Sequence, residues 1–76
     1  MTIKKNLILI FKKKFHLKIS DQKIIKLSNS NFKKWDSLEH INLLMMVEKK
    51  FKIKFKFREI TELNSFSKIE KFLSKL

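Results

Sequence analysis

The most reactive arrangement in the sequence is the tripeptide Asp36-Ser37-Leu38, which stands between a long polar stretch and a strongly helical segment. A serine at the start of a helix presents its hydroxyl to solvent, beside backbone N–H groups that have no partner within the helix. A phosphate attached to that hydroxyl would lie at the positive end of the helix dipole. Taken alone, the tripeptide is more simply a helix cap, with Asp36 as the N-cap.

The other polar side chains do not predict an enzyme or a metal site. His16 and His40 are the only histidines, and His40 is expected to pack on the core or beside a group attached at Ser37. The seven acidic residues are spread along the chain without a paired-carboxylate pattern. The absence of cysteine excludes disulfides, thiolate zinc sites and a cysteine nucleophile.

The length of 76 residues predicts one domain, spanning residues 1–76, with a hydrophobic fraction of 43% that suffices for one core. No apolar run approaches the roughly 18 residues of a membrane span. The run Leu7-Ile8-Leu9-Ile10-Phe11 is too short for a signal peptide, and lysines rather than small residues follow it. We therefore expect a cytoplasmic protein with an intact N-terminus.

The net charge of +12 has two interpretations. It could reflect a polyanionic partner, either nucleic acid or an anionic membrane surface. It could equally reflect codon bias in an AT-rich genome, since the chain lacks Gly and Pro and is rich in Lys, Ile, Asn and Phe. With either cause, any partner must tolerate the positive field.

Hydrophobic spacing predicts two elements in the first half of the chain. A helix is expected from Thr2 to Phe15, with Thr2 as its cap. A long connection follows from His16 to Trp35, in which Ser20 or Asp21 could cap a short turn of helix. A connection of this length in a small domain is usually functional or packed on the core.

The second half begins with the clearest helix, from Asp36 to about Phe51, where Glu39 would complete a capping box with Asp36. The next segment, to Arg58, alternates apolar and basic residues as a strand does. Because a lone strand has nothing to pair with, we expect an extended connection with its apolar side on the core. A helical turn near residues 58–62 and a last helix over residues 65–76 complete the chain.

The helix that follows Ser37 carries two apolar faces, whereas a surface helix normally carries one. One face comprises Leu43, Leu44, Val47 and Phe51. The nearly opposite face comprises Leu38, Ile41 and Met45. In so small a bundle, either the helix is buried all round or the second face is an exposed stripe that docks a partner.

The stretch from Asp36 to Phe51 resembles the acyl carrier protein family. In that family Asp-Ser-Leu opens a helix that ends in Glu, two charged residues and Phe, as Glu48-Lys49-Lys50-Phe51 does here. The N-terminal half matches only in layout, one helix followed by a long loop. The resemblance continues after the helix at Ile53, Phe55, Leu63, Phe66, Ile69 and Phe72.

The resemblance implies an all-α fold, a small antiparallel four-helix bundle with a short third helix, and a monomer that catalyses nothing by itself. Ser37 would receive 4′-phosphopantetheine from coenzyme A, and Asp36 would help to position the metal ion and phosphate in the complex with a phosphopantetheinyl transferase. The arm would present an acyl or aminoacyl thioester to enzymes of fatty acid, polyketide or related biosynthesis. Such partners would dock on Leu38, Glu39, Ile41, Met45 and Glu48.

Two features depart from the family. Carrier proteins are usually acidic, whereas Lys49 and Lys50 stand here where acids are common, so dedicated partners are expected. Lys34-Trp35 also occupies a place where the family often has Gly. The alternative is a small basic helical module without a prosthetic group, binding nucleic acid or an anionic membrane surface. A single arginine and phenylalanines at core spacing disfavour nucleic acid.

Overall fold

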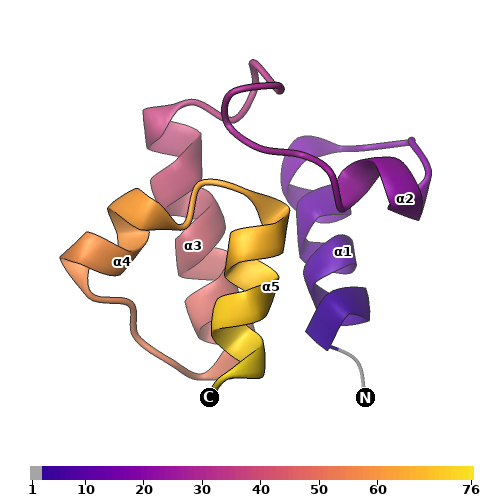
Figure 1. Ribbon diagram of the computed structural model, residues 1–76. Coiled ribbons are helices and arrows are strands. Elements are labelled where there is room, and N and C mark those ends of the chain that lie inside the picture. The colour runs from indigo at the N-terminus through magenta and orange to yellow at the C-terminus, as the bar shows by residue number, and fades with distance from the viewer. Residues whose placement is uncertain (1–2) are drawn as a thin grey trace.

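The computed structural model describes residues 3–76, and every regular element in this range is a helix (Figure 1). The radius of gyration, 11.3 Å, is that of a compact domain of this length, about 11 Å. The predicted all-α class is therefore confirmed. The helices are α1 (Ile3–Phe15), α2 (Asp21–Ile24), α3 (Ser37–Phe51), α4 (Phe57–Glu62) and α5 (Phe66–Ser74).

The helix count differs from the predicted four because the turn after Ser20 forms a separate helix, α2. The Ser20 hydroxyl accepts the backbone N–H of Lys23, which caps this single turn. The short helix predicted as the third is α4, and it begins at Phe57, one residue earlier than expected. The cap predicted at Thr2 for the first helix lies outside the described residues.

The core lies between α1, α3 and α5. Helix α1 packs against both of the others, and α1 and α3 run in opposite directions (Figure 1). Aromatic rings fill the centre: the ring of Phe11 lies 5.2 Å from both Trp35 and Phe66, centroid to centroid. Trp35 lies in the long connection, so this loop contributes its largest side chain to the core.

The long connection is fastened to the far end of the chain. Asn29 N–H donates to Asn64 O at 3.0 Å, and Phe66 N–H donates to Leu27 O at 3.0 Å. These two bonds hold the loop against the start of α5, where Ser65 caps the helix by accepting from Lys68 N–H. The loop is therefore packed on the core, as its length indicated, and it delivers the chain to α3 in a defined position.

Two of the helices end in a conformation that normally selects glycine. His16, after α1, and Lys52, after α3, have φ of 55° and 57°. In both cases the next residue bonds back across the turn, Leu17 N–H to Lys12 O and Ile53 N–H to Glu48 O, both at 3.1 Å. These are Schellman-type ends. Because the chain contains no glycine, ordinary side chains bear the strain of the left-handed region.

None of the helices within residues 3–76 has the length and apolar character that a membrane crossing requires.

The strained end of α3 yields a stability prediction. Lys52 is exposed and its positive φ disfavours any residue with a Cβ, so Lys52→Gly should raise the free energy of unfolding by about 1 kcal/mol. Urea denaturation measures the change. Lys54→Gly, in the extended connection two residues later, is the control and should not stabilise the protein. Equal effects of the two substitutions would contradict the strain at Lys52.

Candidate functional site

Ser37 is the first residue of α3, and its side chain is exposed. Asp36 precedes it in extended conformation and caps the helix, its Oδ1 accepting the N–H of Glu39 at 2.9 Å. The first backbone bond of the helix runs from His40 N–H to Asp36 O at 2.8 Å. The N–H groups of Ser37 and Leu38 therefore have no acceptor within the helix and point toward its positive end.

Glu39 does not complete the capping box predicted with Asp36. Its carboxylate instead forms an ion pair with Lys14, near the end of α1. The pair ties the start of α3 to the end of the antiparallel α1, so the prediction was half right: Asp36 caps the helix, but Glu39 acts between helices. Because α1 carries three lysines in its last turn, an ion pair between the helices competes with the local bond.

A buried hydrogen-bonded chain supports the site from below. Trp35 Nε1–H donates to His40 Nδ1 at 2.8 Å, and His40 Nε2 lies 2.6 Å from the backbone oxygen of Ile60 in α4. Since the indole can only donate, Nδ1 must be the acceptor, and Nε2 must carry the hydrogen and donate to the Ile60 oxygen. His40 is thus a core residue, which was one of the two positions predicted for it. Its two hydrogen bonds join the loop, α3 and α4.

The second apolar face of α3 is exposed. The exposed fractions of Leu38, Ile41 and Met45 are 66%, 48% and 53%, whereas Leu43, Leu44 and Val47 on the other side are buried. The structure therefore excludes the interpretation in which α3 is buried all round. Ser37 lies at the start of this exposed stripe, which runs along the helix away from it.

Glu48, predicted as a docking residue, is held within the molecule. Its Oε2 accepts the backbone N–H of Phe55 at 2.8 Å, which draws the connection between α3 and α4 back against α3. The connection accordingly places Phe55 in the core and leaves Ile53 half-buried. Phe57 breaks the expected alternation: it begins α4 and is 82% exposed. The alternation of apolar and basic residues predicts Phe57 on the buried side. This prediction is wrong because the backbone changes from extended to helical at residue 57.

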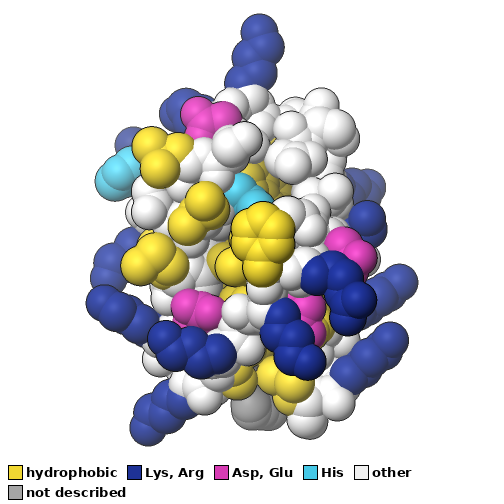
Figure 2. Space-filling model, turned by 90° about the vertical axis from the view of Figure 1, so that its left-hand side faces the viewer, with side chains coloured by type: hydrophobic (Ala, Val, Ile, Leu, Met, Phe, Trp, Pro, Cys, Tyr) yellow, Lys and Arg dark blue, Asp and Glu magenta, His cyan; other side chains and the backbone are white. Residues whose placement is uncertain are grey.

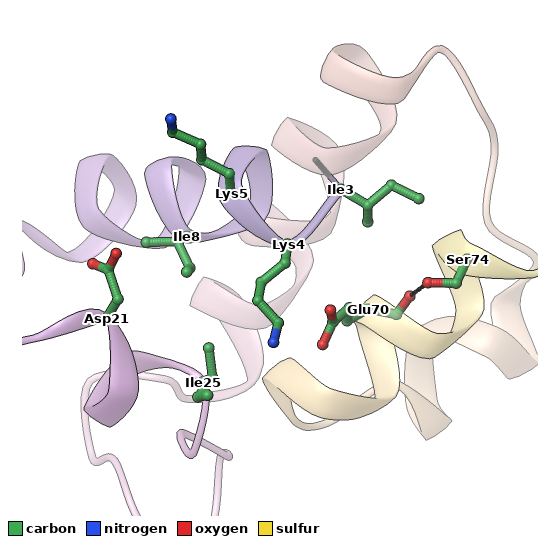
Figure 3. Close-up of a pocket in the computed structure, with 8 residues that line it drawn as sticks. All are labelled: Ile3, Lys4, Lys5, Ile8, Asp21, Ile25, Glu70 and Ser74. Carbon is green, nitrogen blue, oxygen red and sulfur yellow. Dashed lines mark hydrogen bonds between the residues drawn. The ribbon is translucent and has the colours of Figure 1, made fainter. Parts of the chain in front are cut away.

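A further groove of the surface lies elsewhere (Figure 3). It has a volume of about 690 Å³ and runs between α1, α2 and α5, with Ile3, Ile8 and Ile25 among its lining residues. Lysines and acids line it together, including Lys4, Asp21 and Glu70, so its charge favours neither sign. None of the predicted site residues contributes to it.

Within residues 3–76, no group of three or more His, Asp or Glu side chains lies close enough to ligate one metal ion. Asp36 is the carboxylate nearest to Ser37 in the chain, and its second oxygen has no bonded partner among the described residues. The local resources for chemistry are therefore one free hydroxyl, one carboxylate and the unpaired N–H groups of the helix start.

Comparison of the chain with protein-family models, with curated proteins and with solved structures gives no significant match.

The buried chain through His40 yields the second prediction. In His40→Leu, the Trp35 Nε1–H and the Ile60 carbonyl lose their partner, and the free energy of unfolding should fall by about 1–3 kcal/mol. Urea denaturation followed by the fluorescence of Trp35, the only tryptophan, measures the change. Asn42→Leu, an exposed position on the same helix, is the control and should change stability by no more than about 0.5 kcal/mol. Equal effects would show that the bonds do not stabilise the fold.

Proposed function

We propose that this protein is an acyl carrier protein, which holds an acyl or aminoacyl group as a thioester on a phosphopantetheine arm attached to Ser37. One observation carries the proposal: an exposed serine begins a capped helix whose outer face is an exposed apolar stripe. A carrier needs both features next to each other, since an enzyme that acts on the arm must bind the protein close to the attachment site. The resemblance of residues 36–51 to that family supports the same assignment.

The surroundings of Ser37 fit a phosphodiester. The unpaired N–H groups at the start of α3 can donate to phosphate oxygens, and the helix dipole favours negative charge there. Asp36 shares a groove with Lys14, Lys34 and Glu39. Lys14 is paired with Glu39, so Lys34 is the cation that can offset the added charge of a phosphate. When attached, phosphopantetheine would supply the thiol that forms the thioester.

In this proposal the chain itself is a substrate and a carrier rather than an enzyme. On loading, Ser37 Oγ bonds to the phosphorus of the pantetheine phosphate of coenzyme A, the pyrophosphate bond breaks, and adenosine 3′,5′-bisphosphate leaves. The free carboxylate oxygen of Asp36 would help to hold the metal ion that the transferase brings. The need for coenzyme A agrees with the expected cytoplasmic location, and self-repulsion at +12 agrees with a monomer.

The first test of the proposal is loading at Ser37. Incubation with coenzyme A, Mg²⁺ and a broad-specificity phosphopantetheinyl transferase should add one phosphopantetheine group, measured by intact mass. Ser37→Ala should abolish the gain and leave the fold nearly unchanged, because Asp36 still caps α3. Ser67→Ala is the matched control, since Ser67 is also exposed in the first turn of a helix, and it should load like the wild type.

A second substitution separates the cap from the loading reaction. In Asp36→Asn, the amide oxygen can still accept Glu39 N–H, so stability should change by only a few tenths of a kcal/mol. The loading rate should fall at least about tenfold, because a neutral amide is a much poorer metal ligand than a carboxylate. A normal loading rate in Asp36→Asn would limit Asp36 to capping.

No mass gain on the wild type, repeated with a transferase from the native host, would overturn the proposal. The basic helical module without a prosthetic group would then be the remaining interpretation. Its test is binding to nucleic acid and to anionic vesicles as a function of salt concentration.

A further inference from the structure

Phe57 is the most exposed large apolar side chain among residues 3–76. It stands at the first position of α4, a helix with no buried residue, so packing within the molecule does not explain a phenylalanine there. Exposed aromatic side chains next to other apolar groups are typical of protein interfaces, where they are enriched. The exposed groups beside Phe57 therefore indicate which surface it belongs to.

Two hydrogen bonds fix the position of Phe57 relative to α3. Ile60 is bound to His40 near the start of α3, and Phe55 is bound to Glu48 near its end. Residue 57 lies between these two attachments, so it is held alongside the middle of α3. The exposed stripe of Leu38, Ile41 and Met45 occupies the same stretch of that helix. Figure 2 shows the result, a face of α3 and α4 on which hydrophobic side chains gather.

The charge around this face is positive. Seven basic and five acidic residues lie between positions 34 and 62, a stretch that includes all of α3 and α4, so the local excess is two positive charges. Lys49, Lys52 and Lys54 share a groove with Met45, and Lys56 and Arg58 flank Phe57 in the chain. All five of these basic side chains are exposed, and Figure 2 shows both basic and acidic groups around the yellow patch, with the basic ones extending furthest from the surface.

Four of the five acids in this stretch are engaged in internal contacts, whereas the fifth, Glu62 at the end of α4, is exposed. Asp36 caps α3, Glu39 is paired with Lys14, Glu48 accepts Phe55 N–H, and Glu59 accepts Lys56 N–H at 2.7 Å. These carboxylates serve the fold, whereas the lysines extend into solvent. A partner therefore meets an apolar centre within a mainly cationic border.

We propose that Leu38, Ile41, Met45 and Phe57 form one docking face for a protein partner that presents an apolar helix or groove bordered by acidic side chains. The inference extends the proposed function by naming the charge of the partner and by adding Phe57 from α4. The face itself requires no group on Ser37. Apolar burial supplies the affinity, and the opposite charges speed encounter and select among partners.

A pair of synthetic helical peptides tests the inference on the Ser37→Ala protein, which cannot be loaded. Both peptides carry leucines at positions i, i+3, i+4 and i+7; one has glutamates on its other face and the other has lysines. A third peptide keeps the glutamates but replaces the leucines by glutamine. Fluorescence anisotropy should show that the leucine–glutamate peptide binds most tightly of the three and that salt weakens its binding.

Matched variants locate the binding. Phe57→Ser should weaken the leucine–glutamate peptide at least about tenfold, since a buried phenylalanine is lost. Leu9→Ser should have little effect, because Leu9 is 55% exposed but lies on α1. Lys54→Glu should weaken binding more than Lys5→Glu, since Lys54 shares the groove with Met45, although both substitutions change the net charge equally. All four variants are compared with the wild type at one salt concentration.

Three results would overturn the inference: preference for the lysine peptide, equal binding of the glutamine control, or equal loss in Phe57→Ser and Leu9→Ser. These outcomes do not depend on the loading assay. Failure to load with normal peptide binding would remove the carrier proposal and keep the docking face. Normal loading without selective peptide binding would keep the carrier proposal and remove the docking face.

Discussion

The hydrogen-bonded chain from Trp35 through His40 to Ile60 is the interaction on which the rest of the molecule depends. An imidazole with two directed bonds can satisfy them in only one ring orientation, so it sets the distance between the long loop, α3 and α4 at once. The indole that donates to it is itself buried among Phe11 and Phe15 of α1. Polar bonding and aromatic packing thus meet at one residue of the loop, directly before Asp36 and Ser37.

The contacts of Trp35 explain how a small chain can hold Asp36 and Ser37 in a defined position at the exposed end of a loop. A domain of this size buries only about 60% of its unfolded surface, so its stability margin is small. It also carries a self-repelling charge and two helix ends strained by the lack of glycine. The aromatic cluster and the bonds between Leu27, Asn29 and the start of α5 offset these costs, and they fasten the loop at its middle and at its Trp35 end.

Helix α3 has two apolar faces with different surroundings. Its inner face supplies Leu43, Leu44 and Val47 to the core, and its outer face remains apolar without a partner in the chain. The carboxylates around it serve the fold, since each is used to cap a helix or to join two segments. A carboxylate that looks like a recognition group in the sequence can therefore be a structural group in the fold, and in the proposed docking face the lysines carry the free charge.

The sequence by itself determined the helices, because hydrophobic spacing and capping residues act within a few positions along the chain. It also determined the cap at Asp36 and the exposed place of Ser37, but it left open whether the Leu38 face of α3 is buried or exposed. Only the tertiary structure decided the partners of Glu39 and Glu48, the role of His40 and the exposure of Phe57. These depend on residues distant in the chain: Lys14 lies 25 positions from Glu39, and Ile60 lies 20 from His40. Local patterns carry no information on such contacts, since they form only when the helices pack.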